Sequence, residues 1–391
     1  MKYFILIIML IITTPSVFAI EFDLFGYYEN QTTSVLNNKP DFLSYNKLRL
    51  DFAKEISSDI SFNSNLVFQT YHGKTSICLL DYLTNELLNS YSQEIGISID
   101  DLKQSYTIKS EDEIFLDNAF LSLYQKHFNL RSGKQQIALG TGYAWNPTDI
   151  YNAKNIFDPT YEKRGVNALK LEIPFTSEGM ISSIVAIGEN WEETTKSVHL
   201  KLFLFSYDFE LSYARHQHNW IDYYSMNQNI EDRDLFGFSF SGALFGIGIW
   251  SETAFNKMSD SDDYYQGIIG ADFTFENGLY LMSEYYYNGL GKQNENDYQF
   301  ANWMSLFTDG TNLGRDYLYL GESYSIGELI EWSNYIIVNL NDKSFTYTPW
   351  LSFSLNDNVD FYLTANIPYG NDNSEFSQFE ENIAVRLKVY F

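Results

Sequence analysis

The chain has 391 residues and a formal net charge of −26 at pH 7. This negative charge excludes a protein that binds along the phosphate backbone of nucleic acids. Its single cysteine, Cys78, excludes an intramolecular disulfide, a c-type haem motif and a cysteine-based metal cluster. Aromatic residues make up 18% of the chain, which a soluble enzyme rarely needs, and 7 residues are proline, as few as a chain made mostly of strands requires.

The first residues have the pattern of a signal peptide. Lys2 is the only charged residue among the first twenty, and the apolar run from Phe4 to Ile12 is too short to span a bilayer. Val17 and Ala19 are small residues at the two positions that a signal peptidase reads. We therefore predict a signal peptide over residues 1–19 and one exported domain over residues 20–391.

The exported domain is predicted to consist of strands. No later run of about twenty apolar residues occurs, which excludes a helical membrane protein. Apolar and polar residues alternate instead, for example from Val198 to Leu204, and this period puts alternate side chains on opposite faces of a strand. A soluble sandwich also alternates, so alternation alone does not identify the fold. About eighteen strands are predicted, with sixteen still open, near residues 21–30, 42–54, 59–71, 113–126, 129–139, 165–175, 180–190, 196–206, 207–218, 233–242, 244–253, 264–275, 278–289, 314–326, 328–340, 345–355, 358–369 and 378–391.

The connections between these strands alternate in length. Tight connections, such as 206–208 and 356–358, alternate with long ones. Short turns at one end and long loops at the other are typical of a transmembrane β-barrel with periplasmic turns and extracellular loops. A barrel of 16–18 strands is too wide for its own side chains to fill, so we expect an aqueous lumen. The long connections are 72–112, 140–164, 219–232, 254–263, 290–313 and 370–377.

One long connection, within the segment from Asn129 to Leu169, is predicted to fold inward. Gly140, Gly142 and Asn146-Pro147 give it turn chemistry. An exposed flexible loop would not need five aromatic residues, whereas a loop packed on the inner wall would. We therefore expect this loop to narrow the lumen. The five aromatic residues are Tyr143, Trp145, Tyr151, Phe157 and Tyr161.

This segment is basic within an acidic chain, with seven lysine and arginine residues against three acidic ones from Lys126 to Lys170. Cations at a narrow constriction attract and pass anions. An equally weighted alternative is that these cations pair with Asp149, Asp158 and Glu162 and simply fix the loop. The predicted constriction residues are Arg131, Lys134, Lys154, Lys163 and Arg164, together with Asp149 and Glu162. Arg131 and Lys134 are three residues apart, so alternation places them on opposite faces of the strand. One of them then faces lipid unless Gly133 marks a bulge.

The last strand predicts a second basic feature. Ile383, Val385, Leu387 and Val389 alternate with Ala384, Arg386 and Lys388, and the chain ends at Phe391. Lys47 and Arg49 occupy the matching polar positions of the second strand. Because closure puts the last strand beside the first, Lys47, Arg49, Arg386 and Lys388 are expected to form one basic wall of the pore. The acidic residues predicted to face the lumen lie on later strands and would form an opposite wall: Glu210, Asp272, Glu276, Glu331 and Asp360.

The signal peptide and the terminal strand ending on Phe391 resemble those of bacterial outer-membrane barrels. Gly133-Lys134-Gln135-Gln136, Gly140 and the loop at residues 145–149 resemble large porin families, including the alginate-export-type porins, although Lys134 stands where arginine is expected. The resemblance implies an all-β transmembrane antiparallel barrel in the outer membrane of a Gram-negative-type bacterium. It implies passive diffusion of small hydrophilic solutes, and the basic constriction predicted above adds anions to the expected solutes.

The implied partners are outer-membrane lipid and lipopolysaccharide, the solutes, and the barrel assembly machinery, which would recognise the strand ending at Phe391. A monomer and a homotrimer are both open. Alternatives are a loop-plugged barrel acting as a receptor or adhesin, with residues 72–112 as the plug, a sheath around a partner protein, and a barrel hydrolase. The histidine residues show no context for catalysis, and we predict no enzyme activity, no metal and no cofactor.

Overall fold

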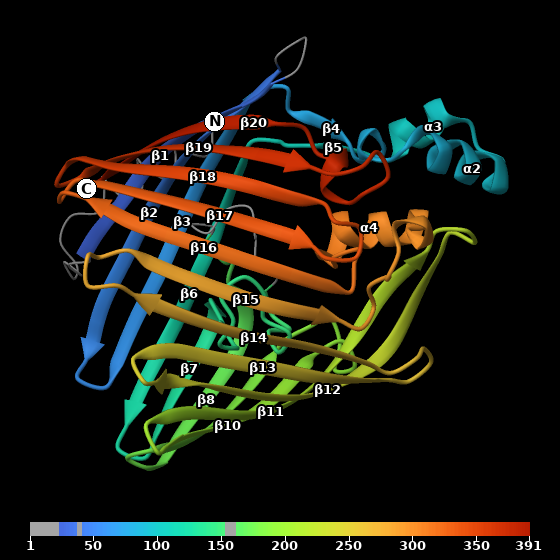
Figure 1. Cartoon of the computed structure of the whole chain (residues 1–391). Coiled ribbons are helices and arrows are strands. Elements are labelled where there is room, and N and C mark those ends of the chain that lie inside the picture. Colours follow the sequence, from blue (N-terminus) through green and yellow to red (C-terminus); the bar gives the residue numbers. More distant parts are fainter. Residues whose placement is uncertain (1–22, 37–40, 153–161) are drawn as a thin grey trace, which may run out of the picture.

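The computed structural model describes residues 23–36, 41–152 and 162–391, and the predicted signal peptide lies outside them. Within this part of the chain, an 18-stranded antiparallel sheet closes on itself as a barrel (Figure 1). β1 (Asp23–Val35) pairs with both β2 (Phe42–Ser57) and the terminal strand β20 (Asn382–Tyr390), which closes the barrel. The expected all-β antiparallel barrel is confirmed, with eighteen strands rather than sixteen.

The other barrel strands follow one another around the wall in chain order. They are β3 (Ile60–Gly73), β6 (Glu113–Gln125), β7 (Phe128–Gln135), β8 (Val166–Thr176), β9 (Gly179–Ala186), β10 (Thr195–Leu204), β11 (Tyr207–Asp222), β12 (Asn227–Leu244), β13 (Ile247–Met258), β14 (Tyr264–Thr274), β15 (Tyr280–Asn288), β16 (Asp316–Ile326), β17 (Ile330–Asn339), β18 (Phe345–Asn356) and β19 (Val359–Tyr369).

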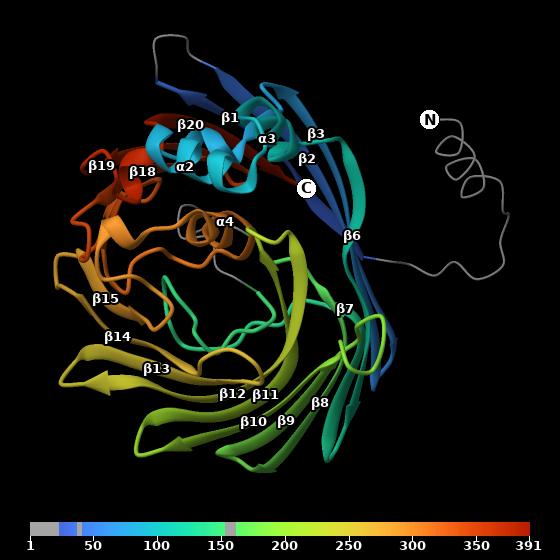
Figure 2. The ribbon, with the colours of Figure 1, turned by 90° about the vertical axis from the view of Figure 1, so that its right-hand side faces the viewer.

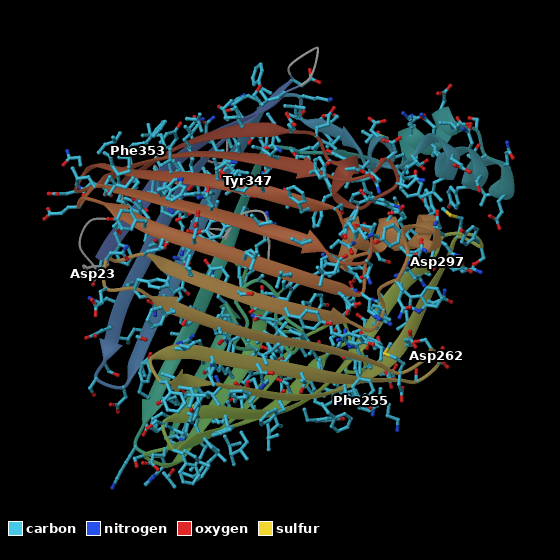
Figure 3. The ribbon with its side chains drawn as sticks, viewed as in Figure 1. Asp23, Phe255, Asp262, Asp297, Tyr347 and Phe353 are labelled. Atoms are coloured by element: carbon cyan, nitrogen blue, oxygen red, sulfur yellow. The ribbon has the colours of Figure 1, made fainter. Side chains whose placement is uncertain are left out.

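The two ends of the barrel differ, as the connection lengths predict. Short turns join the strands at one end, and the helices lie at the other end, where acidic side chains such as Asp262 and Asp297 also lie (Figures 1 and 3). The connection from β3 to β6 carries β4 (Ser76–Cys78), η1 (Leu79–Tyr82), α2 (Asn85–Ile95), α3 (Ile99–Ser105) and β5 (Thr107–Lys109). The connection from β15 to β16 carries η2 (Glu295–Asp297) and α4 (Phe300–Asp309), and η3 (Phe376–Gln378) follows β19.

Local sequence explains where these helices begin and end. The side chain of Thr84 accepts a hydrogen bond from the backbone N–H of Leu87 at 3.2 Å and so caps the start of α2. Gly96 ends α2 in the left-handed conformation, with φ of 70°. Ser98 caps α3 in the same way as Thr84 caps α2. None of the helices in the described part of the chain is both long and apolar enough to cross a membrane.

An apolar cluster ties the loops together at the loop end. Tyr91 of α2 stacks on Phe300 of α4 with ring centroids 3.5 Å apart. The Tyr91 hydroxyl also donates to the backbone carbonyl of Tyr223, at the tip of the β11–β12 hairpin, at 2.5 Å. The insertion between β3 and β6 therefore packs onto neighbouring loops at the barrel mouth (Figure 2), and a different segment lies within the lumen.

β11 and β12 are longer than predicted. The segment 219–232 was expected to be a loop, but Asn219 to Asp222 continue β11, and β12 begins at Asn227. The antiparallel ladder extends to the pair of Asp222 with Asn227. These residues are mostly polar on both faces, so the apolar alternation stops where the backbone ladder continues. The prediction was therefore wrong for this segment.

The outer face of the barrel carries aromatic rings toward both ends. Phe255 lies toward the loop end and contacts Tyr265, with ring centroids 4.7 Å apart. Phe353 lies toward the turn end and contacts Phe361, with ring centroids 5.9 Å apart (Figure 3). Tyr265 is 62% exposed. Two such aromatic zones are typical of a barrel whose ends lie at the two surfaces of a membrane.

Candidate functional site

The described parts of the connection between β7 and β8, residues 136–152 and 162–165, lie inside the barrel, and we call them the inward loop. Figure 2 shows the inward loop within the ring of strands. The expected inward-folded loop is thus confirmed. Of the residues predicted to matter in it, Lys154, Phe157, Asp158 and Tyr161 lie outside the described residues.

Glu252 of β13 holds the first part of the inward loop. One carboxylate oxygen accepts hydrogen bonds from the backbone N–H of Thr148 at 2.6 Å and from its hydroxyl at 2.8 Å. The other oxygen accepts from the backbone N–H of Thr141 at 2.8 Å. Glu252 is fully buried. Loop N–H groups inside a lumen lack strand partners, and the two side-chain oxygens of Glu252 provide acceptors for them.

Glu284 of β15 holds the next turn of the loop in the same way. Its carboxylate accepts from the backbone N–H groups of Tyr143, Ala144 and Trp145 at 2.7, 2.9 and 3.0 Å. It also accepts from the indole N–H of Trp250 at 2.6 Å. Glu284 is fully buried. Two neighbouring wall carboxylates thus fix the loop backbone from Thr141 to Thr148.

The aromatic and glycine residues of the loop fit these contacts. Trp145 is buried and stacks on Tyr286 with ring centroids 5.0 Å apart, and its indole N–H donates to Asn312 at 3.0 Å. Gly140 has φ of 81°, and an added Cβ would lie 2.4 Å from a Glu252 carboxylate oxygen. Glycine is therefore favoured at position 140, both for its backbone conformation and for the close approach of Glu252.

Asp149 and Lys163 form an internal tie of the loop. The Asp149 side chain is fully buried and accepts from the backbone N–H groups of Tyr151 and Asn152, both at 3.1 Å. Lys163 Nζ lies 2.7 Å from its second carboxylate oxygen. The Asp149–Lys163 pair is therefore an ion pair within the loop, as in the alternative interpretation that the cations fix the loop.

Glu162, at the returning end of the loop, contacts the opposite wall. Its Oε2 accepts from the Tyr27 hydroxyl at 2.7 Å, Lys47 Nζ at 2.9 Å and Arg49 Nη1 at 2.8 Å, and Lys388 Nζ lies 3.7 Å from Oε1. Burial alone would raise the pKa of the Glu162 carboxyl. The positive charges of Lys47 and Arg49 and the hydrogen bond from Tyr27 outweigh this effect of burial. Together they lower the pKa of Glu162 to about 2.

Strand register explains why these cations meet. Glu29 of β1 is directly opposite Lys47 of β2 on one side and Lys388 of β20 on the other. Arg49 is held by Asp51, with Nε 2.7 Å from Oδ1, and lies 3.6 Å from Asp117 of β6. Closure therefore brings residues from the two ends of the sequence to one place.

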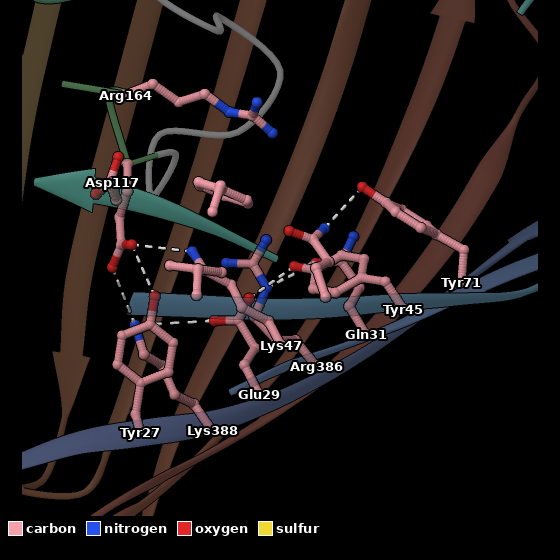
Figure 4. Close-up of a pocket in the computed structure, with 14 residues that line it drawn as sticks. Tyr27, Glu29, Gln31, Tyr45, Lys47, Tyr71, Asp117, Arg164, Arg386 and Lys388 are labelled. Carbon is pink, nitrogen blue, oxygen red and sulfur yellow. Dashed lines mark hydrogen bonds and ion pairs between the residues drawn. The ribbon is translucent and has the colours of Figure 1, made fainter. Parts of the chain in front are cut away.

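A polar cavity of about 250 Å³ lies beside the inward loop, and its lining includes Glu29, Lys47, Asp117, Glu162 and Lys388. Figure 4 shows Lys47, Arg386 and Lys388 grouped around it with Glu29 and Tyr27. Arg386 Nε donates to Gln31 at 2.6 Å. The four cations predicted to form a basic wall, Lys47, Arg49, Arg386 and Lys388, thus lie together, with acidic residues interleaved among them.

The other predicted constriction cations lie elsewhere. Arg131 packs over the Phe120 ring, with its guanidinium 4.6 Å from the ring centroid. Arg164 pairs with Glu113 at 2.9 Å and lies over Phe115 near the cavity. Lys134 is opposite Ala119 and Asn167, with no register shift in β7.

Lys134 shares a strand face with Ser132, whose partners Leu121 and Leu169 are both exposed. By register it therefore faces outward, and the structure does not bring it to the cations beside Glu162. The Gly133 bulge that would have turned it inward is absent from both ladders of β7, within the described residues.

The predicted acidic wall is only partly as expected. Glu276 lies in the turn between β14 and β15 rather than on a strand. Glu210 is paired with His199 at 2.8 Å, Asp272 accepts from Tyr280 at 2.8 Å, and Asp360 accepts from Ser354 at 3.1 Å. Glu331 is exposed on β17. Glu252 and Glu284, two buried acidic residues that accept hydrogen bonds from the loop backbone, were missed.

Parity could have placed Glu252 and Glu284 on the inner face. The alternation Trp250, Glu252, Ala254 and the alternation Met282, Glu284, Tyr286 put both carboxylates on the inward side of their strands. Their partners are backbone N–H groups, which every residue except proline carries, so the sequence contains no residue pattern that identifies the contact.

No protein-family model and no curated protein matches the sequence. Among solved structures, the chain is similar to Pseudomonas aeruginosa OpdQ, with 7% identity, a TM-score of 0.57, and 95% of this chain and 98% of that chain covered. It also matches a triple mutant of the Rhodopseudomonas blastica porin, with 12% identity, a TM-score of 0.46, and coverage of 95% and 100%. The overlap with OpdQ identifies the fold. The chain is a closed, antiparallel 18-strand β-barrel with the same overall fold as OpdQ.

Proposed function

We propose that this protein is an outer-membrane porin through which small hydrophilic solutes diffuse passively. The proposed constriction lies between the inward loop and the wall formed by β1, β2 and β20. The observation that carries the proposal is the position of the loop. It is fixed by Glu252 and Glu284 on one wall and meets Lys47 and Arg49 through Glu162 on another.

A loop held in this way narrows a wide barrel without requiring a separate plug domain. The cavity of about 250 Å³ beside Glu162 is lined mostly by charged and neutral polar side chains, which suit hydrated solutes. Channel selectivity depends on such lining groups and on the width of the passage. The loops at the barrel mouth pack on one another rather than on this cavity.

The proposed selectivity is a modest preference for anions. Four basic residues line the cavity against three acidic ones, in a chain whose net charge is −26. The local excess of positive charge attracts anions where the passage is narrow. The basic residues are Lys47, Arg164, Arg386 and Lys388, and the acidic ones are Glu29, Asp117 and Glu162.

We place the protein in the outer membrane of a Gram-negative-type bacterium, exported by its signal peptide and in contact with lipid and lipopolysaccharide. The terminal strand supports assembly by the barrel machinery, because Phe391 is 55% exposed where the barrel closes. Its backbone N–H donates to the carbonyl of Gly26 at 3.1 Å, and its carbonyl accepts from the N–H of Gly26 at 3.0 Å.

The proposal is tested by conductance in planar bilayers, with the refolded mature protein and a potassium chloride gradient. We expect discrete open steps and a reversal potential that favours chloride. The double substitution Lys47→Gln and Arg49→Gln should move the reversal potential toward potassium. Lys126→Gln is the matched control, because Lys126 is exposed in the turn between β6 and β7. Folded protein that inserts without conducting would contradict the porin proposal.

A further inference from the structure

Glu162 places a carboxylate of the protein's own chain among the cations of the pore wall. Three donors converge on its Oε2: the Tyr27 hydroxyl, Lys47 Nζ and Arg49 Nη1, at 2.7, 2.9 and 2.8 Å. The donors come from β1 and β2, adjacent strands of the rigid barrel wall. The carboxylate comes from the loop, so the receptor and its occupant belong to separate elements.

The receptor is held in shape independently of Glu162. Arg49 is oriented by Asp51 at 2.7 Å, and Lys388 Nζ lies 3.8 Å from the centroid of the Tyr27 ring and 3.8 Å from Glu29. Glu162 is not a partner in any of these contacts, so we expect the donors to remain in position for another carboxylate. The Glu162 side chain is 30% exposed, which leaves it accessible from the lumen.

We propose that this cluster is a binding site for small monocarboxylates, and that Glu162 is an internal competitor that a solute carboxylate replaces. The inference rests on the proposed porin function and specifies its solute class. The exchange substitutes one carboxylate for another on the same three donors, so the ion pairs lost by Glu162 are regained by the solute. No covalent step is involved.

The surroundings favour a single negative charge. Asp51 and Asp117 lie 2.7 and 3.6 Å from Arg49, and Glu29 lies 3.8 Å from Lys388. These three acidic residues would repel the second charge of a dianion such as sulfate. A planar carboxylate can place one oxygen on the three donors and direct the other toward Lys388, as Glu162 does at 3.7 Å.

The attachment of Glu162 to the same chain as its donors sets the strength of solute binding. An attached group competes with an effective concentration on the order of millimolar or higher. A solute carboxylate with similar contacts would therefore bind at about millimolar concentration, which is weak enough to leave. Conduction requires such a balance between entry and release.

The test is block of the chloride current by sodium propanoate, applied to the mature protein in a planar bilayer. In Glu162→Gln, the amide no longer competes, and we expect the half-blocking concentration of propanoate to fall by about tenfold relative to the unmodified chain. Glu178→Gln removes the same charge from an exposed turn between β8 and β9 and should leave the block unchanged. Adding Lys47→Gln to Glu162→Gln should abolish the gain.

The outcomes separate this inference from the porin proposal. Absence of current in every variant would overturn the porin function itself. Current with equal propanoate block in Glu162→Gln and the unmodified chain would overturn the exchange and leave the porin. Equal block by sodium sulfate would overturn the monocarboxylate assignment. If Glu162→Gln fails to assemble, as judged by heat-modifiable mobility on gels, Glu162→Ala provides the same comparison. Propanamide on the unmodified chain should not block, and block by it would also contradict the inference.

Discussion

The inward loop meets two walls of the barrel through carboxylates, but the roles of loop and wall are reversed between them. On β13 and β15, the carboxylates of Glu252 and Glu284 belong to the wall, and the donors are backbone N–H groups of the loop. On β1 and β2, the donors are wall side chains, and the carboxylate of Glu162 belongs to the loop.

This reversal gives the two contacts different consequences. Glu252 and Glu284 are fully buried and satisfy backbone groups that would otherwise lack acceptors, so losing them exposes unpaired donors in the loop. Glu162 is partly exposed and contacts side chains that a solute can also contact. We infer that the first wall determines where the loop lies, and that the second determines which solutes it favours.

The largest effect on stability and conductance is expected from substitution of Glu284. Glu284→Ala removes the acceptor of three loop N–H groups and of the Trp250 indole. We expect the free energy of unfolding to fall by about 3 kcal/mol or more, because each buried unpaired donor costs about 1–3 kcal/mol. Single-channel conductance should rise as the loop is released. Urea unfolding in micelles and bilayer recording measure the two effects.

Glu331→Ala is the control for this prediction, because Glu331 is an exposed acidic residue on β17. We expect its effect on unfolding to stay within about 0.5 kcal/mol. If Glu284→Ala leaves both the stability and the conductance at the values of this control, the wall carboxylate does not hold the loop.

A smaller effect is expected at Gly140. In Gly140→Ala, the added Cβ would lie 2.4 Å from a carboxylate oxygen of Glu252, at a backbone φ of 81°. Gly246 provides a matched position, with φ of 83° and nothing within 4 Å of an added Cβ. Both substitutions carry the backbone strain, about 1 kcal/mol, and Gly140→Ala should cost about 1–2 kcal/mol more in unfolding free energy. Equal costs would show that Glu252 is not closely packed there.

Much of the barrel could be predicted from sequence because strand alternation and connection length are local signals. Val359 to Ile367 alternates as predicted and forms β19. The prediction failed between residues 219 and 232, where the ladder of β11 and β12 continues through polar residues. A strand without an apolar face pairs through its backbone, and backbone hydrogen bonding leaves no period in the sequence.

In the candidate site too, the residues on strands could be predicted from the sequence, and the contacts of the loop could not. Parity and closure together predict that Lys47, Arg49, Arg386 and Lys388 lie on one wall, because both rules follow from strand geometry. The same parity places Lys134 opposite to Arg131, and the regular register of β7 leaves it facing outward. The contact of Glu162 with Lys47 and Arg49 could not be predicted. The path of a long loop depends on contacts such as those of Glu252 with loop N–H groups.

The smallest predicted effect is the pH dependence of the contact that Glu162 makes with the wall of β1 and β2. The pKa of Glu162 is lowered from 4.5 to about 2. A depressed folded-state pKa means that the contact contributes stability above about pH 4.5 and loses it as the pH falls toward 2. Other acidic residues titrate in the same range, so the useful quantity is the difference in reversal potential between the unmodified chain and Glu162→Gln. That difference should persist from pH 7 to about pH 4 and disappear near pH 2. Disappearance near pH 4.5 would show that Lys47 and Arg49 do not hold the Glu162 carboxylate in its ionised form.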